Sequence, residues 1–343
     1  ITSGRLPPVT SPVMMMKTAH LAGMPIVGLG VWKAPAEVTA QVVYDAIKVG
    51  YRHLDCACDY GNEQAVGAAL KRAFADGVCT RKDLWITSKL WNTYHRREHV
   101  APACQRTLDD LGLEYVDLYL VHFPIALDFV PFEQCYPPEW TDKPGNQGLL
   151  KLAHVPYRET WEAMEALHGA GKAKNIGVSN LNVQSLMDLL SYATVKPVCN
   201  QIENHVYLTQ PKLVDFCHDQ GLAVVSFSPL GAVSYIGIGM ATPEENCLQD
   251  PVVTEIAAAK GKTPAQICLR FQVERGNAVI PKSEKVERLK ENLDILDFQL
   301  SPEEMTRLLA LNRSRRFNDP AVYAKGWGAP GSWLAQHGLP IYE

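Results

Sequence analysis

The stretch that decides the fold is GYRHLDCACDYGNE, residues 50–63. Gly50 ends one amphipathic segment, and residues 52–55 are typical of a short buried strand. Asp55 stands where this strand gives way to a loop, and Tyr60 follows just before the next helical segment. A carboxylate at a strand end and a phenol on the following loop can face one point, as a proton-transfer site requires. An isolated Asp and Tyr are more often a turn residue and a packing residue, so the rest of the chain must decide.

The same unit, a short apolar run followed by a loop and an amphipathic helix, recurs along the chain. Strands are predicted at 27–30, 52–55, 84–89, 116–122, 173–178, 198–203, 223–228 and 278–281. Helices are predicted at 36–49, 63–75, 96–111, 157–170, 183–190, 211–220, 251–260, 264–274 and 285–292. Eight strands alternating with helices imply an α/β fold with a parallel sheet, and eight such units favour a (β/α)8 TIM barrel. An open doubly wound sheet is the alternative, but no G-x-G-x-x-G follows the first strand.

The segments outside these units give further expectations. Residues 1–16 are predicted to be a disordered tail or a cloning remnant, and residues 17–343 a single barrel domain that starts with a hairpin over 17–26. Long loops follow the fourth strand, at 123–155, and the seventh, at 231–249. The tail from residue 313 is too aromatic for a solvated linker, so we expect it to fold over the barrel mouth.

Composition narrows the class of protein. The net charge is only -4 and the basic residues are scattered, which argues against nucleic acid or an anionic membrane as a partner. No apolar run approaches the roughly 20 residues of a membrane span. The nine cysteines have irregular spacings, as free thiols in a reducing compartment would, and no secretory signal is recognisable. We therefore expect a cytoplasmic protein. A small-molecule substrate and a monomer or homodimer are further expectations, which composition does not decide.

Polar residues stand where most of the predicted strands stop. They are Asp55, Lys89, His122, Ser179, Asn180, Gln201 and Ser228. Each has an ordinary explanation by itself, such as a surface lysine, a core histidine or a helix cap. In a barrel, however, they would all line the carboxyl-terminal rim, where the active sites of barrel enzymes lie.

These residue types suit the reduction of a carbonyl group by a nicotinamide. The phenol of Tyr60 has an ordinary pKa of about 10, which a neighbouring ammonium such as Lys89 is expected to lower. Asp55 can hold Lys89 by an ion pair, and His122 can orient a carbonyl oxygen.

The remaining rim residues suit the nicotinamide itself. Ser179, Asn180 and Gln201 can hydrogen-bond a carboxamide. Phe227, beside Ser228, can stack on a flat ring.

A second informative stretch is IPKSEKVERLKEN, residues 280–292, which follows the eighth predicted strand and opens a helix. Lys282, Ser283 and Arg288 gather cationic and hydroxyl donors there, which indicates a phosphate site. A solvated charged face is the alternative interpretation.

Together the motifs resemble the aldo-keto reductase family from about residue 24 to residue 320. The matching runs, in the family's order, are GYRHLDCACDYGNE (50–63), KLWNTYH (89–95), LVHFP (120–124), GVSN (177–180), NQIE (200–203), SFSPLG (226–231) and IPKS (280–283). HFPIALDFVPFEQCYPP (122–138) and RRFNDP (315–320) are similar to the xylose reductases and the plant aldose-6-phosphate reductases.

The resemblance implies a TIM barrel that binds NADPH without a Rossmann fold. It implies Tyr60 as general acid, with Asp55, Lys89 and His122 completing a tetrad. The implied cofactor residues are Ser179, Asn180, Gln201, Phe227, Ser228, Leu230, Lys282, Ser283, Arg288 and Asn292. The implied substrate residues are Trp32, Phe123 and Asn318; no metal is implied.

The expected activity is NADPH-dependent reduction of an aldehyde or aldose carbonyl. Reduction of a sugar phosphate or a ketosteroid, and a barrel that binds NADPH without catalysis, are the alternatives. Two further motif matches are set aside. Tyr44 and Lys48 fit Y-x-x-x-K but lie on a predicted amphipathic helix, and residues 95–99 fit H-x-x-E-H without an evident third zinc ligand.

Overall fold

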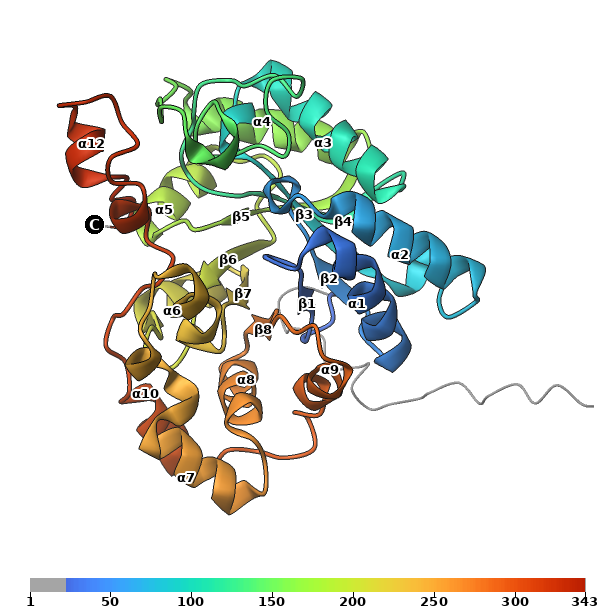
Figure 1. The fold of residues 1–343 in the computed structure, drawn as a ribbon, viewed down its shortest axis with the longest axis vertical. Helices are drawn as coiled ribbons and strands as arrows, with labels where there is room; N and C mark the ends of the chain where they lie inside the picture. Colours follow the sequence, from blue (N-terminus) through green and yellow to red (C-terminus); the bar gives the residue numbers. More distant parts are fainter. Residues whose placement is uncertain (1–22, 343) are drawn as a thin grey trace, which may run out of the picture.

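The computed structural model describes residues 23–342, which fold around eight parallel strands (Figure 1). The strands neighbour one another in chain order. They are β1 (Leu29–Gly30), β2 (His53–Asp55), β3 (Trp85–Leu90), β4 (Val116–Val121), β5 (Ala173–Ser179), β6 (Cys199–Glu203), β7 (Ala223–Phe227) and β8 (Ala278–Val279). Such an order results when each strand is followed by a helix that returns the chain to the start of the next strand.

The helices lie outside the strands (Figure 1). Those of the repeating units are α1 (Ala36–Val49), α2 (Glu63–Ala75), α3 (Arg97–Leu111), α4 (Tyr157–Gly169), α5 (Val183–Tyr192), α6 (Pro211–Asp219), α7 (Pro251–Lys260), α8 (Pro264–Glu274) and α9 (Val286–Leu293). The chain then adds α10 (Pro302–Leu309), α11 (Pro320–Tyr323) and α12 (Trp333–His337). No helix between residues 23 and 342 combines the length and the apolar character that a bilayer crossing needs.

Hydrogen bonds between β8 and the segment before β1 close the sheet. Val279 forms a parallel bridge with Val27, and its N–H donates to Ile26 O at 2.8 Å. The Gly28 N–H donates to Val279 O, also at 2.8 Å. This closure confirms the predicted barrel over the open doubly wound sheet, whose edge strands would stay unpaired.

The repeating units form almost where the sequence predicts them. Helices α1, α2, α7 and α8 have the predicted bounds, and the other predicted elements differ by at most two residues at either end. The strands are nearly wholly buried, because helices cover one face and the barrel interior the other. The first arm of the predicted hairpin, residues 17–21, and the predicted tail, residues 1–16, lie outside the described residues.

Three helices after residue 293, α10, α11 and α12, were not predicted from the sequence. A signal was present for α10, which Ser301 and Glu304 start as a reciprocal capping box, with Pro302 in the first turn. Helices α11 and α12 are too short for a periodic pattern to identify them.

Close packing of α2 on α3 depends on Gly67. A Cβ atom added there would lie 2.5 Å from Asp110 O, which belongs to the backbone of α3. We expect Gly67→Ala to lower the free energy of unfolding by about 1–3 kcal/mol, since overpacking against backbone outweighs the better helix propensity of Ala. Gly169→Ala in α4, where an added Cβ meets nothing within 4 Å, is the matched control and should be neutral or stabilising. Equal denaturant midpoints for the two variants would contradict this account.

A second prediction concerns pH and Glu63, which is buried at the start of α2. Burial raises the pKa of Glu63 to about 8, although hydrogen bonds from Ser88 and Thr107 act in the opposite direction. Because folding favours the protonated form, this stabilisation is complete below the ordinary value of 4.5 and is lost as pH rises toward 8. Glu63→Gln should therefore flatten the fall in unfolding free energy between these pH values, whereas the exposed Glu37→Gln should leave it unchanged. A slope that Glu63→Gln does not alter would refute the assignment.

Candidate active site

A buried ammonium group organises the rim of the barrel. Lys89, near the end of β3, lies within hydrogen-bond distance of Asp55 Oδ1 at 2.5 Å, Cys56 O at 2.8 Å and Tyr60 Oη at 3.1 Å. Lys89 and Asp55 are almost fully buried. The three donors of the ammonium therefore all have acceptors, which a buried charge requires.

Strand register brings these groups together. Asp55 pairs with Thr87, and Lys89 lies two residues beyond Thr87 on the same face of β3. The carboxylate and the ammonium of neighbouring strands therefore point into the same part of the barrel. The second carboxylate oxygen of Asp55 accepts a hydrogen bond from Gln201 Nε2 at 2.7 Å, which ties β6 to this pair across the barrel.

Tyr60 lies on a short 3-10 turn, η2 (Cys58–Tyr60), between β2 and α2. Its oxygen accepts from Lys89, so its own hydrogen remains available for the cavity. The prediction that the Tyr60 pKa is lowered is wrong for the protein without bound ligands. Burial, and after it the charge of the Asp55 carboxylate, raise the pKa of Tyr60 well above its ordinary value. The phenol is accordingly protonated at neutral pH.

His122 follows β4 and completes the predicted group of four. Its ring centroid lies 5.9 Å from that of Tyr60. Its Nδ1 atom lies 3.1 Å from Asp59 Oδ1, a carboxylate that the sequence analysis did not single out. The position of Asp59, directly before Tyr60 on the same turn, was the available signal.

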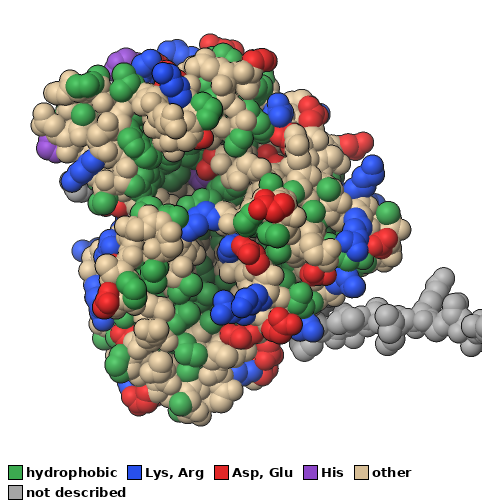
Figure 2. All heavy atoms as spheres, viewed as in Figure 1, with side chains coloured by type: hydrophobic (Ala, Val, Ile, Leu, Met, Phe, Trp, Pro, Cys, Tyr) green, Lys and Arg blue, Asp and Glu red, His purple; other side chains and the backbone are tan. Residues whose placement is uncertain are grey.

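The rim opens into a cavity of about 700 Å³. Figure 2 shows the hollow near the middle of the face that looks down the barrel, with Lys and Arg side chains and hydrophobic side chains around it. Among the predicted site residues, those that line it are Trp32, Asp55, Tyr60, His122, Phe123, Ser179, Asn180, Gln201, Phe227, Ser228, Leu230, Lys282, Ser283, Arg288 and Asn318. Lys89 lies behind Asp55 and Tyr60, and Asn292 is buried on α9 outside the lining. The structure thus brings all but these two into contact with one cavity.

Linked polar side chains form one wall. Ser179 Oγ donates to Gln201 O at 2.8 Å, and Asn180 Nδ2 donates to His122 O at 2.9 Å. Asn180 and Ser228 both have positive φ, 65° and 48°, which is uncommon outside glycine and marks backbone held by its surroundings. This wall presents amide and hydroxyl groups in fixed positions.

Cations gather at the other end of the cavity. Lys282 and Arg288 lie on the loop after β8 and on α9, and Lys33 approaches them from the loop after β1. Burial, and then the charge of Lys282, lower the pKa of Lys33. Glu284 neutralises part of this charge through its 2.5 Å contact with Lys282. Polar groups at one end and several cations at the other fit a long anionic ligand such as a phosphorylated nicotinamide dinucleotide.

Aromatic residues from distant segments form the outer wall. Trp32 and Phe123 were predicted to contact the substrate. The other aromatic residues of this wall were not predicted as site residues; they are Trp91, Trp140, Tyr235, Tyr323 and Trp327. The rings of Trp140, on the loop after β4, and Tyr323, on α11, are 5.7 Å apart. The Leu150 N–H donates to Trp327 O at 2.7 Å. The predicted folding of the aromatic tail over the barrel mouth is confirmed.

Comparisons with known proteins agree with this geometry. Residues 22–313 match the sequence model of the aldo/keto reductase family. A probable NAD(P)H-dependent D-xylose reductase of Aspergillus clavatus is 47% identical over 323 residues, covering 93% of this chain and 96% of that protein. A protein of the same description from Emericella nidulans is 45% identical over 302 residues, covering 88% and 94%.

Among solved structures, the aldose reductase from Schistosoma japonicum is 39% identical, with a TM-score of 0.78. The match covers 88% of this chain and 94% of that one. The chain belongs to the aldo/keto reductase family.

Proposed function

We propose that this NAD(P)H-dependent oxidoreductase reduces the carbonyl group of an aldose or a related aldehyde, and that Tyr60 protonates the carbonyl oxygen. The observation that carries the proposal is the hydrogen bond from Lys89 Nζ to Tyr60 Oη. It leaves the phenolic proton free for a substrate and places a positive charge where negative charge develops when that proton leaves. Asp55 keeps Lys89 in position by its 2.5 Å contact.

The other residues of the site bind and orient. His122 borders the same part of the cavity as Tyr60, so it can hold a carbonyl oxygen near the phenol. Ser179, Asn180 and Gln201 would hold the carboxamide of NADPH, and Phe227 would cover its ring.

Toward the other end of the cavity, Leu230, Ser228, Lys282, Ser283 and Arg288 would hold the remainder of the cofactor, with Asn292 supporting them from α9. When bound, NADPH supplies the hydride that the carbonyl carbon requires. Together with the proton from Tyr60, this converts the carbonyl to an alcohol.

The substrate class follows from the outer wall. Trp32 and Phe123 present aromatic faces, while Asp59 and Asn318 present hydrogen-bonding groups in the same cavity. Carbohydrates carry both apolar C–H faces and hydroxyl groups, so this combination suits a polyhydroxylated aldehyde. The D-xylose named for the relatives is our first candidate.

The cellular compartment and the oligomeric state of the enzyme are also proposals. All nine cysteines are buried free thiols, which suits a reducing compartment such as the cytoplasm. A monomer or homodimer stays our prediction for the assembly.

Replacing the proton donor tests the mechanism. Tyr60→Phe should lower turnover of D-xylose and of a small aromatic aldehyde by about 10²–10⁴-fold, because general acid catalysis is lost. The dissociation constant for NADPH, from fluorescence titration, should change little. Tyr44→Phe, the same change on α1 outside the cavity, is the control and should leave turnover intact. Unchanged NADPH consumption in Tyr60→Phe would refute the role of the phenol.

Cofactor preference tests the cationic end. Arg288→Ala should weaken NADPH binding by about 10–100-fold, the effect of a lost charge-assisted hydrogen bond. NADH, which lacks the 2′-phosphate, should be affected far less. Lys290→Ala, exposed on the same helix and outside the cavity, is the control. Equal weakening of both cofactors by Arg288→Ala would show that Arg288 contacts another part of the dinucleotide.

A further inference from the structure

Residues 313–318, here called the strap, lie between α10 and α11 and run to the rim of the cavity. The Arg313 and Arg315 N–H groups both donate to Tyr207 O, at 3.1 and 3.0 Å. Ser314 between them has a φ of 52°, so the chain turns sharply there. The strap ends at Asn318, one of the residues that line the cavity. The placement of a cavity residue therefore depends on a segment without regular secondary structure.

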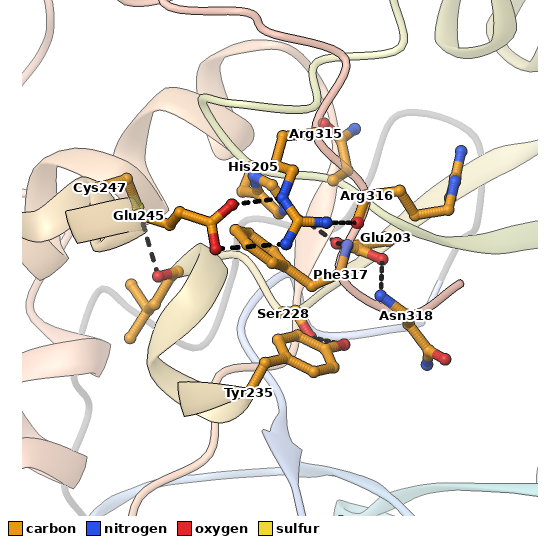
Figure 3. A network of polar contacts seen from close by, with 12 residues as sticks. Glu203, His205, Ser228, Tyr235, Glu245, Cys247, Arg315, Arg316, Phe317 and Asn318 are labelled. Carbon is orange, nitrogen blue, oxygen red and sulfur yellow. Dashed lines mark hydrogen bonds and ion pairs between the residues drawn. The ribbon is translucent and has the colours of Figure 1, made fainter. Parts of the chain in front are cut away.

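Glu203, the last residue of β6, holds the end of this strap. Its Oε1 accepts the Phe317 N–H at 2.8 Å, and its Oε2 accepts the Asn318 N–H at 2.8 Å (Figure 3). His205 Nε2 lies 3.0 Å from Oε1. Each carboxylate oxygen thus holds one of two consecutive backbone amides.

The Glu203 carboxylate is ionised although it is buried, where an unpaired charge would be destabilising. Glu203 has no exposed surface. Burial alone would raise its pKa, but the hydrogen bond from His205, with further contributions from Arg316 and Phe317, lowers the pKa below its ordinary value. A buried carboxylate that stays ionised must be matched by its hydrogen-bond donors, and here two of them belong to the strap.

The strap is also held from its other side by the loop after β7. The Phe317 ring stacks on Tyr235, with centroids 5.6 Å apart, and Tyr235 lines the cavity. Arg315 pairs with Glu245 on η8 (Pro243–Glu245), as Figure 3 shows. The strap is thus clamped between β6 and this loop, and Glu203 provides the contact nearest to Asn318.

We propose that Glu203 is a positioning residue for substrate binding, which fixes the backbone at Phe317 and Asn318 so that the Asn318 side chain meets a hydroxyl group of the substrate. Glu203 does not line the cavity, so it acts through the strap. The inference rests on the proposed reduction of a hydroxylated aldehyde. It adds a buried residue of β6 to those that set substrate selectivity.

Glu203→Gln tests the inference, because an amide NH₂ cannot accept a backbone N–H and one strap bond is lost. We expect the KM for D-xylose to rise about tenfold, as loss of one charge-assisted hydrogen bond implies, with kcat changed by less than about threefold. The KM for propanal, an aldehyde without hydroxyl groups, should stay within about twofold, as should the dissociation constant for NADPH. Glu255→Gln, an exposed residue of α7, is the matched control and should alter none of these values.

A double-mutant cycle shows whether the effect passes through Asn318. Asn318→Ala should raise the KM for D-xylose with the same indifference to propanal. The double variant should then be no worse than Asn318→Ala alone, since Glu203 has no side chain left to position. Additive losses would overturn the inference.

Other outcomes of these measurements would also overturn the proposed role of Glu203. Equal losses on D-xylose and propanal, or a lower melting temperature without a change in selectivity, would show a general structural role and overturn the proposal. If Glu203→Gln does not fold, Glu203→Asp, which keeps the charge but shortens its reach, should show the same selectivity pattern more weakly; unchanged selectivity there would overturn it too. A wild-type protein that reduces propanal but no hydroxylated aldehyde would refute the proposed substrate class, and the inference with it, before any variant is compared.

Discussion

The active site depends on one constraint: the buried ammonium group of Lys89 must have hydrogen-bond acceptors. Lys89 sits inside the barrel, where an unpaired charge would be strongly destabilising. Its acceptors come from the end of β2 and the turn after it: a carboxylate, a backbone carbonyl and a phenol. The hydrogen bonds that compensate the buried charge of Lys89 therefore also position Tyr60 as a proton donor at the mouth of the barrel. The same contacts serve both the stability of the fold and the chemistry of the site.

Further hydrogen bonds link the Lys89–Asp55 pair to other strand ends around the rim of the barrel. Gln201 reaches from β6 to the free oxygen of Asp55, and Ser179 on β5 donates to the backbone of Gln201. Asn180 in turn donates to the carbonyl of His122 after β4. Successive strand ends are thus joined by side-chain hydrogen bonds, which hold together the polar wall that faces the cavity. Preorganised groups of this kind need little rearrangement during the reaction.

The substrate end of the cavity is built differently. Its walls come from the loop after β4, the loop after β7 and the C-terminal segment, which contact one another through aromatic rings and backbone hydrogen bonds. Regular strands do not fix these segments, so single buried contacts such as those of Glu203 carry more of the positioning. The division suits an enzyme in which the strand ends hold the reacting groups and the loops select the substrate.

The sequence by itself determined the repeating units, the closed barrel and the residues at the strand ends. The periodicity of strands and helices is local. Asp55, Lys89 and His122 each stand at a recognisable strand end, and Tyr60 follows on the loop after Asp55. Only the tertiary structure revealed that burial raises the pKa of Tyr60, since exclusion of water depends on every neighbour. It alone also placed Asp59 beside His122, Trp140 and Tyr323 in one wall, and Glu203 beneath the strap. These contacts join segments far apart in the chain through irregular loops, and no local pattern of residues specifies where such loops meet.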